Sequence, residues 1–73
     1  MVDYSKLWIV MKQRNMTKTG LRLGAKLSTS TFAKLGKNEI VSLDVLVRLC
    51  LVLQCQLSDI CTISELKEGA ELE

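Results

Sequence analysis

The chain has 73 residues, a length that allows one domain and is too short for two. Hydrophobic residues make up 48% of it and proline is absent, which excludes a disordered protein and favours a compact helical bundle. No apolar run approaches the roughly 18 residues of a membrane span, so we expect no membrane segment.

The charges are divided unequally along the sequence, although the formal net charge is only +2. Residues 1–38 contain eight basic residues and one acid, a charge of +7, whereas residues 39–73 contain two basic residues and seven acids, a charge of −5. A single lysine is most simply a solubilising residue. A half-molecule of one sign predicts a polyanionic partner, because mixed signs give solubility without self-repulsion.

The cysteines Cys50, Cys55 and Cys61 are odd in number, and the N-terminus lacks the basic start and apolar run of a secretory signal. We therefore expect a reducing, cytoplasmic compartment, with Cys50 as a small core residue. The cysteine spacing is not Cys-x-x-Cys and the chain has no histidine, so we expect no metal and no cofactor. Without histidine, and without a nucleophile beside a base, we also expect that the protein is not an enzyme.

The first predicted helix begins at Tyr4 or Ser5 and ends near Arg14. Apolar residues recur there at the i, i+3, i+4 and i+7 spacing of one helix face, namely Tyr4, Leu7, Trp8 and Met11. Asn15 is expected to end the helix in the left-handed conformation, which asparagine tolerates. We interpret Trp8 and Phe32 as core residues and not as base-stacking groups.

Two short helices are predicted next, joined by a turn of about three residues. Thr17 is expected to cap a helix that runs to about Ala25, and Ser28 to cap a helix over about residues 29–35. The turn opens with Lys26, which is expected to adopt a left-handed backbone at some cost.

The fourth predicted helix follows a loop that starts at Gly36, where we expect another left-handed residue. Ser42 is expected to cap this helix, whose predicted buried face consists of Leu43, Leu46, Leu49, Cys50 and Leu53. Asp59 and Ile60 are expected to belong to a short last turn, which residues 63–66 are placed to extend. We assign residues 1–66 to one domain and residues 67–73 to an acidic, flexible tail.

The pair of short helices predicts a function. A helix presented in this way fits the major groove of B-DNA, where the residues of its first turn meet base edges. Small hydroxyl residues occupy that turn here: Thr29, Ser30 and Thr31. Basic residues on both sides are placed to pair with phosphates, namely Lys18, Arg22, Lys26, Lys34 and Lys37. The alternative is an ordinary capped and solvated helix start.

The segment MTKTGLRLGAKLSTSTFAKLGKNEIVS resembles small regulators of the xenobiotic-response-element (XRE) helix-turn-helix family, which is related to phage repressors. It is most similar to a short subfamily marked by AKLGKNE-x-VS, and the resemblance extends over about residues 4–60. The wider family has glycine where Lys26 stands and a polar helix former where Gly20 stands. These departures affect the expected rigidity of the second helix and not its presence.

The resemblance implies an all-α fold, a compact five-helix bundle with the helix-turn-helix at helices 2 and 3. It implies double-stranded operator DNA as the partner, and a homodimer. The recognition helix would begin at Ser28, with base-reading positions at Thr29, Ser30 and Lys34. The phosphate-contacting positions implied by the family are Lys18, Thr31, Lys37 and Asn38.

Two hypotheses for function are therefore kept. The first is a transcriptional regulator, expected to be a repressor, that occupies an operator and has no chemistry of its own. The second is a protein-interaction module of the same fold, an antirepressor or antitoxin-like binder. A partner-binding version should carry apolar anchors on the third helix, whereas Thr29, Ser30 and Lys34 favour DNA.

The fourth predicted helix is apolar nearly all round, apart from Asp44 and Arg48. Such a helix is buried on several sides or lies at an interface. We expect a homodimer built from this helix and the C-terminal segment, with interface residues Val47, Leu51, Ile60 and Ile63. The alternative is that residues 57–66 fold back over the Val47 and Leu51 ridge within one chain.

Overall fold

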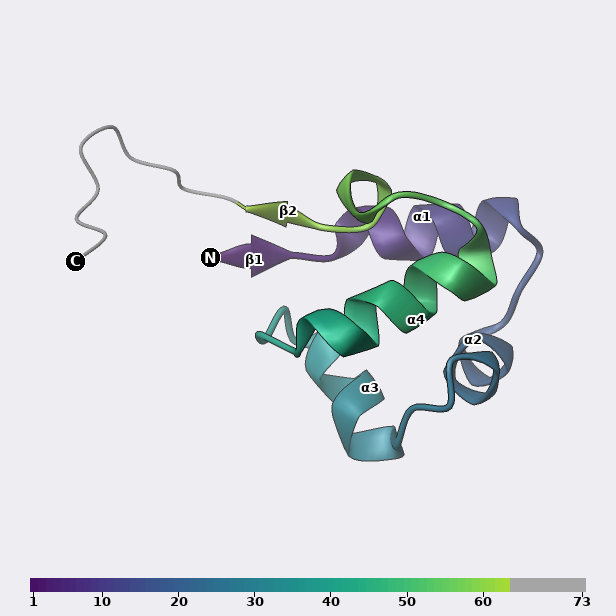
Figure 1. Ribbon diagram of the computed structural model, residues 1–73, viewed down its shortest axis with the longest axis horizontal. Coiled ribbons are helices and arrows are strands. Elements are labelled where there is room, and N and C mark those ends of the chain that lie inside the picture. Colours follow the sequence, from purple (N-terminus) through teal and green to yellow (C-terminus); the bar gives the residue numbers. More distant parts are fainter. Residues whose placement is uncertain (64–73) are drawn as a thin grey trace.

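The computed structural model describes residues 1–63, which form four α-helices, a short 3-10 helix and a two-stranded sheet. In Figure 1, α4 crosses the middle of the molecule, between α1 and the α2–α3 pair. The elements in chain order are β1 (Val2–Asp3), α1 (Ser5–Gln13), α2 (Lys18–Gly24), α3 (Thr29–Gly36), α4 (Leu43–Leu53), η1 (Leu57–Asp59) and β2 (Thr62–Ile63). The expected count of five helices is therefore not matched within residues 1–63, where four α-helices and one 3-10 helix are found, and the expected tail at residues 67–73 lies outside the described part.

The predicted helix starts are confirmed by their side-chain caps. The side-chain oxygens of Thr17, Ser28 and Ser42 accept hydrogen bonds from backbone N–H groups three residues on, at 3.0, 3.1 and 3.3 Å. Each bond satisfies one of the donors that a helix leaves unpaired in its first turn. The start of α1 differs, since Tyr4 makes no cap there and the Asp3 carboxylate accepts from the Ser5 N–H instead, at 2.7 Å.

All four helices end in the same way, with one residue in the left-handed conformation. These residues are Asn15, Lys26, Asn38 and Gln54, with φ of 58°, 58°, 56° and 53°. After each, an N–H group bonds the carbonyl five residues back, as between Glu39 and Lys34 at 2.9 Å. This is the Schellman closure of a helix. It confirms the expectations for Asn15 and Lys26, but Gly36 is still helical, because α3 closes two residues later around Asn38.

The core consists of side chains from the four α-helices, from the residues next to them and from the residue after η1: Tyr4, Leu7, Met11, Leu21, Ala25, Leu27, Leu35, Leu46, Leu49, Leu53 and Ile60. Tyr4 is the polar member, and its hydroxyl donates to the Glu39 carbonyl at 2.8 Å. Burial raises the pKa of Tyr4, so the hydroxyl stays protonated as a donor. Leu43 was expected in this core but is 63% exposed, because the core ends at Leu46, one turn further along α4.

The two ends of the described chain are joined by a pairing that the sequence does not predict. Val2 pairs with Ile63 and Asp3 with Thr62 in an antiparallel arrangement. Ile63 therefore lies in a strand and not in a last helical turn, while Ile60 is fully buried. Of the segment expected to form that turn, residues 64–66 lie outside the described part. Among the helices of residues 1–63, none is long and apolar enough to cross a membrane.

Candidate nucleic-acid interface

The turn between α2 and α3 is held by two arginines that bind its carbonyl oxygens. Arg22 Nη1, from α2, donates to the Leu27 carbonyl at 3.2 Å. Arg48 Nη1, from α4, donates to the Lys26 carbonyl at 3.3 Å. Leu27 itself is buried in the core. The angle between α2 and α3 is therefore fixed from inside by a buried leucine and from outside by two guanidinium groups.

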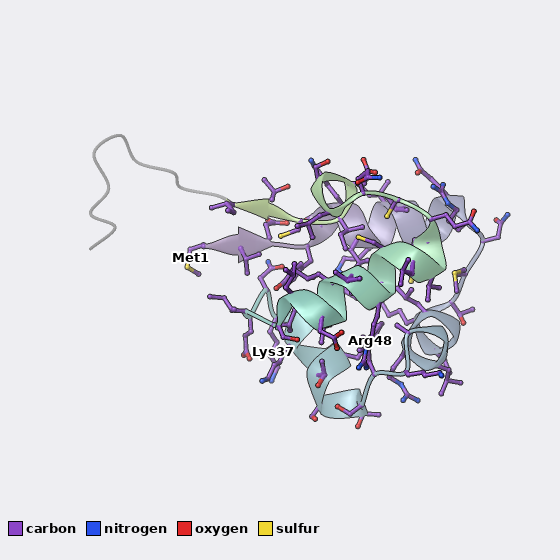
Figure 2. All side chains as sticks on the ribbon, in the orientation of Figure 1. Met1, Lys37 and Arg48 are labelled. Carbon is purple, nitrogen blue, oxygen red and sulfur yellow. The ribbon has the colours of Figure 1, made fainter. Side chains whose placement is uncertain are left out.

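Arg48 connects the helix pair to the neighbouring helix. Figure 2 labels this side chain on the part of α4 beside the α2–α3 turn. Its second nitrogen, Nη2, forms an ion pair with Asp44 at 2.9 Å, one turn earlier on α4. In the sequence, Arg48 is only a polar interruption of an apolar helix. No pattern could have identified it, because a backbone carbonyl leaves no signature in the sequence.

The expected base-reading residues lie together on the exposed side of α3. Thr29, Ser30 and Lys34 are all exposed, and they occupy the first two turns of the helix. Beside them, Ser28 Oγ bonds Thr31 Oγ1 at 3.0 Å and Ser30 Oγ at 3.2 Å. The start of α3 is thus a small polar surface with its hydroxyl groups already ordered.

An aromatic pair supports α3 from the side of α1. The rings of Trp8 and Phe32 meet edge to face, with centroids 5.7 Å apart and planes at 74°. Both are partly buried against the core, as the sequence interpretation expected. The Lys18 ammonium lies 5.0 Å from the Trp8 ring, a favourable cation–π arrangement at the start of α2.

The basic residues of the first 38 do not all lie on this surface. Lys18, Lys26, Lys34 and Lys37 are exposed and come from α2, α3 and the residues that end these helices. Figure 2 labels Lys37 at the end of α3. By contrast, Lys6 Nζ and Arg14 Nε bind carbonyls of the C-terminal half, those of Ser58 at 3.1 Å and Leu53 at 2.9 Å.

Two of the expected phosphate contacts are used within the chain. Arg22 is half-buried and holds the turn carbonyl described above. Asn38 accepts a hydrogen bond from the Tyr4 N–H through its Oδ1, at 3.0 Å, and so joins the end of α3 to the start of α1. Thr31 is half-buried beside Ser28. Lys26, Lys34 and Lys37 remain exposed around α3, and Lys18 is exposed beside the Trp8 ring.

The outer surface of α4 is apolar and open. Leu43, Val47 and Leu51 are 63%, 45% and 72% exposed. They lie along a groove of about 590 Å³ that also includes Cys50, Gln54, Cys55, Gln56 and Leu57. Residues 57–63 leave this ridge uncovered. Ile60, expected at an interface, is fully buried in the core of its own chain and has no surface to offer a partner.

The comparisons with known proteins agree with this geometry. The crystal structure of the transcriptional regulator VanUg, in its form II, matches with a TM-score of 0.81 and 51% sequence identity, over 84% of this chain and 81% of that one. No curated protein matches the chain. Residues 6–65 match the family model of the Cro/C1-type HTH DNA-binding domain. The resemblance to helix-turn-helix regulators is confirmed: this chain belongs to the Cro/C1-type helix-turn-helix DNA-binding domain family.

Proposed function

We propose that the protein is a transcriptional regulator that represses by occupying an operator in double-stranded DNA, with no chemistry of its own. The observation that carries the proposal is the exposed polar start of α3, presented by a turn whose carbonyls are held by Arg22 and Arg48. A helix held in this way can enter the major groove without first being ordered. The similarity to a transcriptional regulator supports the same role.

In this proposal the residues of α3 have separate tasks. Thr29, Ser30 and Lys34 face base edges, because they are exposed on its first two turns. Phosphates on either side are bound by the exposed Lys18, Lys26 and Lys37, by Thr31, and by the Nδ2 group of Asn38, whose Oδ1 is taken by the Tyr4 N–H. Arg22 is assigned to the turn and not to phosphate, since its Nη1 is bonded to the Leu27 carbonyl.

The proposal includes a homodimer that forms through the exposed ridge of α4. Val47 and Leu51 are apolar, exposed and uncovered by residues 57–63. Ile63 is also exposed, but it does not line the groove on α4, so the ridge carries the argument. Two copies joined at α4 would place their recognition helices about one DNA turn, roughly 34 Å, apart on a near-palindromic operator.

A mobility-shift assay with the DNA upstream of the protein's own gene tests the proposal. Each phosphate contact releases condensed counterions, so the affinity should fall steeply between about 50 and 200 mM salt. A competitor duplex of scrambled sequence measures specificity in the same lanes. Absence of binding to any duplex, or a flat salt dependence, would overturn DNA binding and favour the alternative, a protein-interaction module that uses the apolar surface of α4.

A further inference from the structure

The end of α4 brings two cysteines together. Gln54 adopts the left-handed conformation, with φ of 53°, and the Cys55 N–H then bonds the Cys50 carbonyl at 3.1 Å. This closure places the side chains of the residues at its two ends in contact. At the end of α4 those residues are Cys50 and Cys55, whose thiols interact electrostatically.

The backbone geometry permits these two thiols to form a disulfide. With a 3.1 Å bond from the Cys55 nitrogen to the Cys50 oxygen, standard covalent lengths limit the Cα–Cα distance to at most about 7 Å. A larger separation could not be bridged without movement of the backbone. Cys61 is placed differently, because it follows η1, precedes β2 and does not line the groove on α4.

Both thiols are accessible from the same side. Cys50 and Cys55 are half-buried, and both line the open groove beside Leu51, which is 72% exposed. Burial, followed by the charge of the neighbouring Cys55, raises the pKa of Cys50 to about 11, with smaller contributions from Asp59 and Cys61. Cys50 therefore remains a protonated thiol at neutral pH, which leaves the first attack on an oxidant to the other thiol of the pair.

We propose that Cys50 and Cys55 form a dithiol redox site whose oxidant is a low-molecular-weight disulfide. The Cys55 thiolate attacks one sulfur of that molecule, which forms a mixed disulfide and releases one small thiol. Cys50 then gives up its proton, and its sulfur attacks Cys55 and displaces the second small thiol. Two protein thiols are oxidised to one disulfide, and one small disulfide is reduced to two thiols. In a reducing compartment such a bond is transient, as expected of a sensor.

This inference rests on the end of α4 and not on DNA binding or dimer formation. The dithiol site and the proposed homodimer share one surface, because a second copy bound at the groove on α4 would cover both thiols. Oxidation should therefore slow as the protein concentration rises through the range in which a dimer forms. A rate that is independent of concentration would count against the dimer and leave the dithiol site standing.

The test is oxidation of the full chain by oxidised glutathione, read by intact-mass spectrometry. Closure of one disulfide lowers the mass by about 2 Da, whereas a stalled mixed disulfide raises it by about 305 Da. A tryptic peptide cannot assign the bond, because the chain has no lysine or arginine between Arg48 and Lys67 and all three cysteines stay together. Single substitutions assign it instead.

Cys61→Ser leaves the proposed pair intact and should close as the unaltered chain does. Cys50→Ser leaves Cys55 with Cys61, and Cys55→Ser leaves Cys50 with Cys61. Both variants should accumulate the glutathione adduct. In the folded protein, disulfide closure between Cys50 and Cys55 should be favoured over closure of either other pair by a factor on the order of tenfold, because the fold holds those two sulfurs together. In urea the preference over the pair Cys55 and Cys61 should vanish, since the loops between Cys50 and Cys55 and between Cys55 and Cys61 are nearly equal in length.

Circular dichroism shows whether each variant folds, and alanine replaces serine in any that does not. Any one of three results would overturn the proposal: that Cys61→Ser forms no disulfide, that the unaltered chain stops at the glutathione adduct, or that the preference for Cys50 and Cys55 is the same in urea as in buffer.

Discussion

The α2–α3 pair and the outer surface of α4 are both exposed, yet they differ in every property that decides a partner. The exposed side of α3 carries hydroxyl groups and lysines on a rigid turn. The outer surface of α4 carries leucine and valine beside an open groove. A chain of this size can therefore bind a polyanion with one surface and an apolar partner with another. Arg48, on α4, touches the α2–α3 turn and so joins the two.

The largest expected effect follows from placing a charge on the apolar surface. Leu51→Glu should leave folding nearly unchanged, because this side chain is 72% exposed. A carboxylate buried against a second copy is unpaired, however, so the dimer should dissociate at micromolar concentration. Operator affinity should then fall about 100-fold, because two half-sites are no longer bound together. Analytical ultracentrifugation measures the mass, and Ile9→Glu, on a residue 56% exposed on α1, is the matched control.

If Leu51→Glu has the same sedimenting mass as the unaltered protein, the apolar surface of α4 does not bind a second copy, and the contrast between the two surfaces fails. A mass that halves while operator affinity stays constant would show a dimer that DNA binding does not need.

The polar surface should respond in sequence preference. Thr29→Ala or Ser30→Ala should cost about 1–3 kcal/mol of operator affinity if the hydroxyl contacts a base edge. Affinity for a scrambled duplex should not change, because the charges are retained. Binding titrations on both duplexes measure the difference. Equal losses on the two duplexes would show that the hydroxyl groups serve the backbone of DNA or the helix start and do not read sequence.

The helix starts of this fold could be predicted from the sequence because they are local. Thr17 and Ser28 bond N–H groups three residues away, so the capping residue and its partner lie in one short segment. The left-handed ends at Asn15 and Lys26 depend on equally short segments.

The features that could not be predicted depend on distant partners. The strand Val2–Asp3 has two residues and pairs with residues some 60 positions away, so no periodicity marks it. The sequence predicts a phosphate contact for Arg22 and only a polar interruption of an apolar helix for Arg48, yet the fold uses both to bind carbonyls of the same turn. Leu43 fits the spacing of the buried residues of α4, but the core does not reach it.

The link between the two surfaces should show a smaller effect. Arg48→Gln removes the hydrogen bond to the Lys26 carbonyl and should cost about 1 kcal/mol of stability, since the guanidinium is partly exposed. Operator affinity should fall about fivefold as the turn loosens. Asp44→Asn is the control, because it removes the ion pair and keeps the carbonyl bond, at a cost of about 0.3–0.5 kcal/mol. Urea denaturation and titration with operator DNA measure both. Equal losses in the two variants would assign the effect to the ion pair and leave the turn independent of Arg48.

The smallest expected effect distinguishes a phosphate contact from general charge. Lys37 is exposed at the end of α3, whereas Lys6, on α1, binds the carbonyl of Ser58 next to η1. Each substitution by alanine removes one positive charge, so the long-range attraction to DNA changes equally in both. Only a direct contact releases counterions at the site. Lys37→Ala should therefore lower the slope of log affinity against log salt by about one and weaken all duplexes alike, whereas Lys6→Ala should leave the slope unchanged. A change in sequence preference for Lys37→Ala would mean that the position of α3 in the groove is shifted from the one proposed, with Lys37 at a base edge.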